Sequence, residues 1–393
     1  MANTQLSLSL NTRCAAMFAA YYALLYPGAM MLPSCMIMLG YDSALIAIMS
    51  SISGAISLLL RPVFGMITDR GHCRTLCFLF SVSTAVGTAF FFLSPVHDFL
   101  HAVLFAVFES TSVSCCIDLI DSWALKLVKQ TGEVDYGKVR AYGSASFAVF
   151  GLFFGWVVSR TGIVIVPYTI FFLILIFLLF VFMVPDPDSG SDSGDQVSLK
   201  DGFRLLKSKR FLSFVVFYAF ASATYIFTDV YITVLILERG GTTAHTGLND
   251  FIAAMLEFIF LHRYTRVAER IGTDRTVWIG MIGFFIKASL AAIMPTPWLI
   301  ILACTSQLIS YCFFLPSRMR FLEENVDQHE MGSALFVSSF VTSVLSTFIF
   351  NPIASRLIPR VGTGNTMLLF SLPALLSGIG FIIVTRKLKA KEM

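Results

Sequence analysis

The sequence predicts an all-α integral membrane protein with twelve transmembrane helices in two six-helix halves. The first observation is composition: of 393 residues, 56% are hydrophobic and 13% are charged, about half of the ~25% charged residues of an ordinary soluble domain. So little polar surface could not cover a soluble core. Second, the apolar residues gather in runs that approach or exceed the ~20 residues a helix needs to cross the hydrocarbon. Third, a polar stretch near the middle of the chain divides these runs into two sets.

The apolar runs are separated by Pro and by polar residues, as is usual between elements. We place the twelve spans at 14–39, 43–67, 75–94, 99–124, 139–159, 162–184, 211–236, 247–265, 275–294, 297–316, 332–355 and 364–385. The first run has no small-residue cleavage site, so we interpret it as a retained helix and not as a cleaved signal peptide.

The longest polar stretch, VPDPDSGSDSGDQVSLKDGFRLLKSKR, is rich in Ser, Gly and Asp. Such a composition is typical of a linker. It predicts an N-terminal half over 1–184, a cytoplasmic linker over 185–210 and a C-terminal half over 211–393. A weak internal repeat supports the division. ITDRGHCRT at 67–75 and AERIGTDRT at 268–276 share acid, Arg, Gly, Arg and Thr in order, as expected for two parallel halves of a transporter.

Basic residues are distributed unequally between the two sets of loops. One set holds Arg70, Arg74, Lys126, Lys129, Lys200 to Arg210, Arg263 to Arg275, Arg318, Arg320 and Arg386 to Lys391, and the other holds only Arg160, Arg239, Arg356 and Arg360. By the positive-inside rule both termini are cytoplasmic, which requires an even number of spans. We therefore expect a multi-pass protein of the cell membrane.

Several classes of function lack support in the sequence. The basic residues lie in short loops and not along one face, so nucleic-acid binding is not expected. The eight cysteines fall mostly in apolar runs, and Cys73 and Cys77 have no second pair nearby, so we expect buried thiols and no metal site. No cofactor is expected. A membrane enzyme or lipid-handling protein is the weaker alternative, because no nucleophile motif or His-rich metal box accompanies the acids.

The segment RPVFGMITDRGHCR (61–74) resembles the loop signature of the major facilitator superfamily, G-x-x-x-D-R-x-G-R. Gly65, Asp69, Arg70 and Arg74 match, whereas Cys73 stands where the signature has Gly. The resemblance implies a gating loop, in which the Gly permits close helix approach, the Asp caps a neighbouring helix and the arginines tie the loop to carboxylates and carbonyls. The alternative is plain positive-inside charge.

DYGKVRAYGSASF (135–147) resembles the start of the fifth helix in the lactose, phenylpropionate and nucleoside permease branch of that superfamily. In that branch an acid on helix four faces an Arg on helix five, as Asp121 and Arg140 would here. The following glycines form a small-residue face suited to tight packing. Phe147 stands where the branch has the Trp that stacks on a galactoside, so lactose itself is not implied.

The ionised groups at Asp121 and Arg140 have two interpretations. A charge at the bilayer centre costs about 2.5–3.5 kcal/mol on insertion scales, so such residues pair with each other or line a cavity. The pair could be a structural bridge between two helices. We favour a substrate contact, because a guanidinium fork suits a hydroxylated or carboxylated ligand.

The resemblance extends into the second half. Glu257 and Lys287 are similar to the coupling Glu and the Arg it communicates with in the lactose permease, so they are the expected proton-coupling residues. The alternative is a Glu257–Lys287 salt bridge that only fastens two helices. Asp229 matches a carboxylate of span seven, but no Lys on span eleven could pair with it. Gln307 and Ser310 stand where His and Glu are expected, and we place Asp229 and Gln307 with the substrate-binding residues.

No nucleotide-binding motif is present, so the energy for transport must come from a gradient. The sequence therefore predicts a monomeric secondary transporter, and not an enzyme, whose halves rock around a central site. Its partners are protons, the lipid bilayer and a small polar organic solute such as a sugar, nucleoside or aromatic acid. Efflux of a drug or metabolite by proton antiport on the same fold is the alternative.

Overall fold

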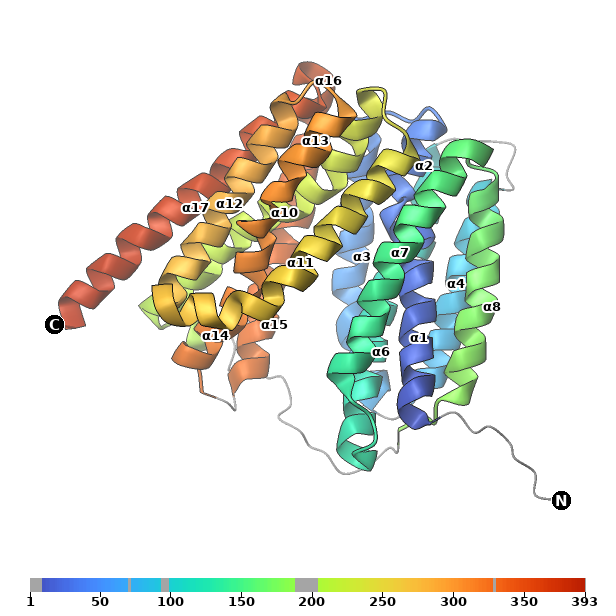
Figure 1. Cartoon of the computed structure of the whole chain (residues 1–393), viewed down its shortest axis with the longest axis horizontal. Helices are drawn as coiled ribbons and strands as arrows, with labels where there is room; N and C mark the ends of the chain where they lie inside the picture. The colour runs from blue at the N-terminus through green and yellow to red at the C-terminus, as the bar shows by residue number, and fades with distance from the viewer. Residues whose placement is uncertain (1–8, 70–71, 93–98, 188–203, 328–329, 393) are drawn as a thin grey trace. The chain divides into compact units, whose positions relative to one another are not determined.

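The computed structural model describes the chain except for residues 1–8, 70–71, 93–98, 188–203, 328–329 and 393. All regular elements of the described residues are helical, and no strand occurs among them (Figure 1). Ten helices of this part are long and apolar enough to cross a membrane. The predicted all-helical membrane fold is confirmed.

Two compact units make up the structure. One comprises Met1–Leu39 and Ile52–Ser191, and the other comprises Gly40–Ser51 and Asp192–Met393. The main division thus falls inside the stretch predicted to be the linker. The short segment at the start of the second span belongs to the second unit, where the Tyr231 hydroxyl donates a hydrogen bond of 3.0 Å to the Ser43 carbonyl.

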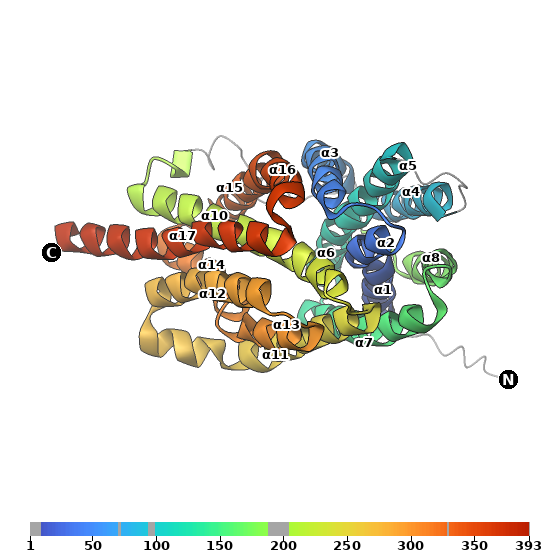
Figure 2. The same ribbon diagram turned by 90° about the horizontal axis from the view of Figure 1, so that it is seen from above.

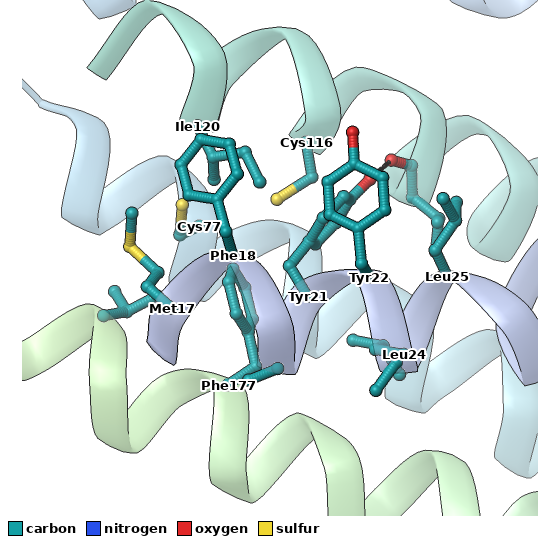
Figure 3. Packing of buried hydrophobic residues seen from close by; sticks show 14 of the residues in the cluster. Met17, Phe18, Tyr21, Tyr22, Leu24, Leu25, Cys77, Cys116, Ile120 and Phe177 are labelled. Atoms are coloured by element: carbon teal, nitrogen blue, oxygen red, sulfur yellow. Dashed lines mark hydrogen bonds between the residues drawn. The ribbon is translucent and has the colours of Figure 1, made fainter. Parts of the chain in front are cut away.

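The helices up to residue 191 are α1 (Leu10–Leu25), η1 (Tyr26–Met30), α2 (Leu32–Met38), α3 (Ser43–Asp69), α4 (Cys73–Phe92), α5 (Phe99–Phe105), η2 (Ala106–Ser110), α6 (Thr111–Thr131), α7 (Tyr136–Thr161) and α8 (Ile165–Met183). The helix α1 packs against both α7 and α8 (Figure 1). Its buried Tyr21 and Tyr22 reach toward the helix that carries Cys116 and Ile120 (Figure 3). This cluster is the core of the first unit.

The remaining helices are α10 (Lys209–Glu238), α11 (Thr243–Ile271), α12 (Thr273–Ile293), α13 (Pro297–Cys304), η3 (Thr305–Leu308), α14 (Tyr311–Asn325), α15 (Met331–Leu345), η5 (Ser346–Phe350), α16 (Asn351–Val361) and α17 (Thr363–Glu392). The helix α17 packs against both α10 and α12 (Figure 2). Stacked rings fill the core of the second unit, with Phe214 and Phe321 at 4.1 Å between centroids.

Two of the twelve predicted spans are helical in the structure but are not among the ten apolar helices. Span 99–124 lies within α5, η2 and α6, and span 247–265 lies within α11. Several residues of α5, η2 and α6 have side chains outside the described part of the chain, and the ten helices are counted only within that part. The helix α11 carries Asp250, Glu257 and Arg263, and charged groups lower the mean hydropathy of any window.

The second copy of the internal repeat forms a sharp corner between two helices. Gly272 has a φ of 86°, a conformation that residues with a Cβ avoid. Its N–H bonds the Ala268 carbonyl at 2.9 Å and so closes α11. The next helix, α12, starts at the following residue, Thr273. The glycine of this repeat is therefore required by the corner.

Candidate functional site

Several transmembrane helices of the two units are interrupted by turns that are not α-helical. In the first unit the interruptions are π turns, at Tyr26–Met30 and Ala106–Ser110. Such turns leave backbone carbonyls without their usual partners and occur often at functional sites. Here hydroxyl groups from other helices replace those partners. Ser53 donates to the Ala106 carbonyl at 2.8 Å, and Ser83 donates to the Phe108 carbonyl at 3.2 Å.

The glycine face predicted after Arg140 contacts the rings of Tyr22 in α1 and Tyr26 in η1. A Cβ added at Gly143 would lie 2.7 Å from the Tyr22 ring, and one added at Gly151 would lie 2.5 Å from the Tyr26 ring. Only a residue without a side chain allows this approach. The glycines therefore place Tyr22 beside Arg140, which lies one turn before Gly143.

Arg140 and Asp121 come together in the first unit, as the sequence predicts. The Arg140 Nε lies 3.8 Å from Asp121 Oδ1, and the two side chains are 36% and 26% exposed. This separation is longer than a hydrogen bond, so the contact between these two atoms is ionic. The Tyr136 hydroxyl also forms a hydrogen bond with the Asp121 carboxylate. Tyr136 belongs to the motif at 135–147 but was not singled out from the sequence.

Aromatic rings flank this ion pair. The Arg140 guanidinium carbon lies 4.7 Å from the centroid of the Tyr22 ring, within the range of a cation–π contact. The Tyr22 hydroxyl is buried and has no hydrogen-bond partner. Two turns along α7, the Phe147 ring packs edge-on against Tyr26 at 5.4 Å between centroids. The first unit therefore combines a cation, a carboxylate, aromatic faces and one unsatisfied hydroxyl.

The second unit has its own buried charge at Lys287, whose side chain is 3% exposed. Its Nζ donates a hydrogen bond of 2.7 Å to Gln307 Oε1 and lies 4.0 Å from Asp229 Oδ1. The same atom lies 6.0 Å from the centroid of the Tyr225 ring. Lys287 thus brings together two residues that the sequence assigned to substrate binding.

Gln307 is positioned by a close approach between α12 and the short 3₁₀ turn η3. A Cβ at Gly283 would lie 2.6 Å from the Ile309 carbonyl carbon. The absent side chain lets α12 touch the backbone that follows η3. Because residues four apart share a helix face, Lys287 lies one turn beyond Gly283 on that side and reaches Gln307.

Glu257 lies on α11 and is half-buried. Its electrostatic neighbours include Tyr225 and Cys312. One interpretation of the sequence was a salt bridge between Glu257 and Lys287. In the structure Lys287 forms an ion pair with Asp229 of α10. The absence of a Lys on span eleven had left Asp229 without a candidate partner. Its cation comes from span nine instead.

The gating-loop residues are described only in part. Gly65 and Asp69 belong to α3, but their side chains lie outside the described residues, as does all of Arg70. Arg74 donates from its Nη2 to the Val184 carbonyl at 2.8 Å, and its backbone N–H donates to Asp186 Oδ1 at 3.0 Å. The Arg74 guanidinium thus binds a carbonyl, whereas the bond to the Asp186 carboxylate comes from its backbone.

Two further donors bind the same end of α8. Arg13 Nη1 donates to the Met183 carbonyl at 2.9 Å, and Trp123 Nε1 donates to the Pro185 carbonyl at 2.9 Å. The last carbonyls of a helix have no partners within it, so Arg13 of α1 satisfies one of them, and Trp123 of α6 bonds a carbonyl just beyond the helix. Neither residue was expected from the sequence. In the sequence each is simply a side chain with an N–H group near the end of an apolar run.

These features define a multi-pass membrane protein built for transport, with ionisable residues inside two helical units. A family model described as "MFS_1 like family" matches residues 17–324. The chain therefore belongs to the MFS_1-like family and is a major facilitator superfamily transporter. The resemblance read from the sequence motifs is confirmed.

Relatives and solved structures agree with this assignment. The maltose permease of Geobacillus stearothermophilus is 22% identical over 285 residues, which are 72% of each chain. The sucrose permease of Escherichia coli is 24% identical over 250 residues, 61% of this chain and 58% of that protein. The crystal structure of the nucleoside transporter NupG superposes with a TM-score of 0.77 at 19% identity, covering 96% of this chain and 99% of that one.

Proposed function

We propose that this chain is a proton-coupled symporter of a small hydroxylated solute, a sugar or a nucleoside. The observation that carries the proposal is the arrangement around Arg140. A guanidinium stacked on Tyr22, beside the Asp121 carboxylate and an unsatisfied tyrosine hydroxyl, offers both donors and acceptors to a polyhydroxylated ligand. The two permease relatives are named for maltose and sucrose, and NupG for nucleosides.

In this proposal Asp121, Arg140 and Phe147 contact the solute from the first unit. The Arg140 side chain is 36% exposed, and its guanidinium N–H groups would donate to solute hydroxyls. Phe147 and Tyr26 supply apolar faces for a sugar or nucleobase ring. Asp229 and Gln307 belong to the second unit. In this proposal they contribute to solute binding together with Lys287, which contacts both.

Proton coupling is assigned to the ionisable residues of the second unit. Ionisable groups inside transmembrane helices are costly and are kept for ion or substrate pathways. Lys287 and two carboxylates, Glu257 and Asp229, share one neighbourhood around Tyr225. A carboxylate in a low-dielectric interior takes up a proton more readily than one in water. One of these two acids would therefore carry the proton.

Topology and assembly complete the proposal. The excess of Lys and Arg on one set of loops supports cytoplasmic termini in the cell membrane. The halves at 1–184 and 211–393 would move against each other about the linker at 185–210, with Gly65, Asp69, Arg70 and Arg74 as the gating loop. The chain would act as a monomer and not as an enzyme.

The test begins with purified protein and a panel of maltose, sucrose, uridine and an aromatic acid. A solute that binds the folded state raises the unfolding temperature with concentration. The solute that does so is then offered to proteoliposomes with an imposed pH gradient, acidic outside. Uphill accumulation that collapses when a protonophore is added supports symport. Stabilisation by lipophilic cations alone, with no accumulation of any panel member, would instead indicate efflux.

A further inference from the structure

Among the described residues, the hydrogen bond that Lys287 donates goes to a neutral group. Its Nζ lies 2.7 Å from the Gln307 Oε1 amide oxygen but 4.0 Å from the Asp229 carboxylate. The first distance is that of a hydrogen bond, whereas the second is an ionic contact without one. The buried ammonium is thus held mainly by an amide whose charge cannot change.

This arrangement allows the carboxylate to change its charge. A buried cation that loses its counterion is strongly destabilising. If Asp229 took up a proton, Lys287 would still be bonded to Gln307 and would still lie over the Tyr225 ring. The contacts of Lys287 with Gln307 and Tyr225 therefore keep the ammonium stabilised when Asp229 is neutral.

Asp229 is also the accessible member of the pair. Half of its side chain is exposed, compared with 3% for Lys287. A carboxylate on a membrane helix faces protein or water, because exposure to hydrocarbon is too costly. Asp229 therefore lies between a fixed interior cation and the water from which a proton would arrive.

The other titratable groups near the pair come from several helices. Cys304 of α13 interacts electrostatically with both Lys287 and Asp229. Tyr225 of α10 interacts with Asp229 and with Glu257 of α11. Three more groups interact electrostatically with these: Asp250 of α11 with Cys304, Tyr311 with Tyr225, and Cys312 with Glu257 and Lys287. The helices α15 and η5, which also pack on α10, contain no titratable residue, and those of α17 start at Arg386.

We propose that Asp229 is the carboxylate that takes up and releases the coupled proton, and that Gln307 is the positioning residue that holds Lys287 while Asp229 is neutral. In the step, a hydronium ion gives its proton to the Asp229 carboxylate, leaving water and a carboxylic acid, and Lys287 keeps its own proton throughout. The inference deepens the proposed symport by choosing Asp229 over Glu257.

Infrared difference spectroscopy on the purified full chain tests the assignment without any solute. Exposed carboxyl groups lose their protons in acid in every variant, so the diagnostic band is the carbonyl stretch of a carboxylic acid that persists above that range in the wild type. Asp229→Asn should remove this band, and Glu257→Gln should keep it. If Asp229→Asn does not fold, the neutral pair Asp229→Asn with Lys287→Met takes its place, because it leaves no unpaired charge. A band that survives the loss of Asp229 would overturn the assignment.

The role of Gln307 has its own readout in the same spectra. In Gln307→Leu the ammonium has no amide partner, turns to Asp229 and favours the carboxylate. The pH at which half of the band is lost should therefore move toward acid by about one unit. Ser306→Ala is the matched control in the same turn, because the Ser306 hydroxyl donates to the Ala303 carbonyl of the adjoining α13, and it should leave the midpoint unchanged. An unchanged midpoint in Gln307→Leu would contradict the positioning role.

Transport separates failure of this inference from failure of the proposed function. Proteoliposomes are given a pH gradient and radiolabelled maltose, sucrose or uridine. Asp229→Asn should lose accumulation of the transported probe under the gradient. Accumulation by Asp229→Asn at the wild-type level would make the inference wrong while symport stands. A wild type that accumulates no probe under the gradient would refute symport itself, whatever the spectra show.

Discussion

The guanidinium of Arg140 lies over the ring of Tyr22, with 4.7 Å between its central carbon and the ring centroid. Gly143 makes this contact possible, because a Cβ there would collide with the same ring. The contact gives Arg140 a second partner besides Asp121.

Neutralising the ion pair should separate fold from function. Arg140→Gln or Asp121→Asn alone leaves a partly buried charge without its partner and should cost about 1–3 kcal/mol, between the values for exposed and buried pairs. The double variant should recover stability but should neither bind nor transport the solute. Thermal unfolding and solute uptake measure the two effects. Full transport by the double variant would reduce the pair to a structural bridge.

Arg140→Lys should fail as well, although it keeps the charge. An ammonium has no planar face to stack on Tyr22 and cannot present several N–H groups in a fixed plane. The variant should unfold at nearly the wild-type temperature and lose solute binding. Wild-type affinity in this variant would show that charge alone is needed.

Tyr22→Phe should weaken binding without weakening the fold. The Tyr22 hydroxyl is buried and has no partner, so its removal should leave stability unchanged or slightly higher. If that hydroxyl binds the solute, affinity should fall by about tenfold, equivalent to about 1.4 kcal/mol. Tyr21→Phe is the matched control, because the Tyr21 hydroxyl donates to the Val113 carbonyl. The control should cost about 1 kcal/mol of stability and leave affinity unchanged.

Gly143→Ala should disturb the interface between α1 and α7. The new methyl group would lie 2.7 Å from the Tyr22 ring, and such overpacking costs about 1–3 kcal/mol. Because Tyr22 must shift, solute affinity should fall too. Gly137→Ala on the same helix has room, with its nearest atom at 3.5 Å, and should stabilise by about 0.5–1 kcal/mol. Equal unfolding temperatures for the two variants would rule out a tight glycine contact.

Arg74→Gln should destabilise the first unit without changing solute affinity. Arg74 donates to the Val184 carbonyl at the end of α8, and a hydrogen bond from a charged group contributes about 1.5–3 kcal/mol. Trp123→Phe, which loses one neutral hydrogen bond to Pro185, should cost only about 1 kcal/mol. The unfolding temperatures of the two variants, with solute titrations, check this order. A change in affinity without a change in stability would contradict it.

Asp135 should make the start of α7 sensitive to acid. Its side chain accepts the Lys138 backbone N–H at 3.1 Å and forms an ion pair with the Lys138 side chain, and these contacts lower the pKa of the carboxyl group below its ordinary value. A lowered pKa means that the stabilisation is present above the unfolded pKa of ~3.9 and is lost as pH falls through the folded pKa.

Asp135→Asn tests this acid sensitivity because asparagine also caps helices well. The unfolding temperature of this variant should depend less on pH in that acidic range than that of the wild type. Asp135→Ala should be less stable than both at neutral pH, because it removes the cap. Identical pH profiles for the wild type and Asp135→Asn would show that Asp135 does not contribute.

Much of this protein could be predicted from the sequence, because hydropathy and helix-breaking residues act locally along the chain. The long apolar runs between polar and proline-containing turns predicted the helices. The spacing of Gly143 and Gly151 on one face predicted the tight contact that Tyr22 of α1 and Tyr26 of η1 complete.

Only the tertiary structure decided which groups meet. Lys287 pairs with Asp229 and Gln307, which are 58 and 20 residues away in sequence, and Arg318, counted as a loop cation, lies inside α14 with its Nη2 bonded to Ser338 and Ser339. Partner choice depends on the rotation and axial register of helices that are distant in sequence. Hydropathy does not encode these quantities, since many rotations bury the same apolar area. Close packing at glycines such as Gly283 selects one of them.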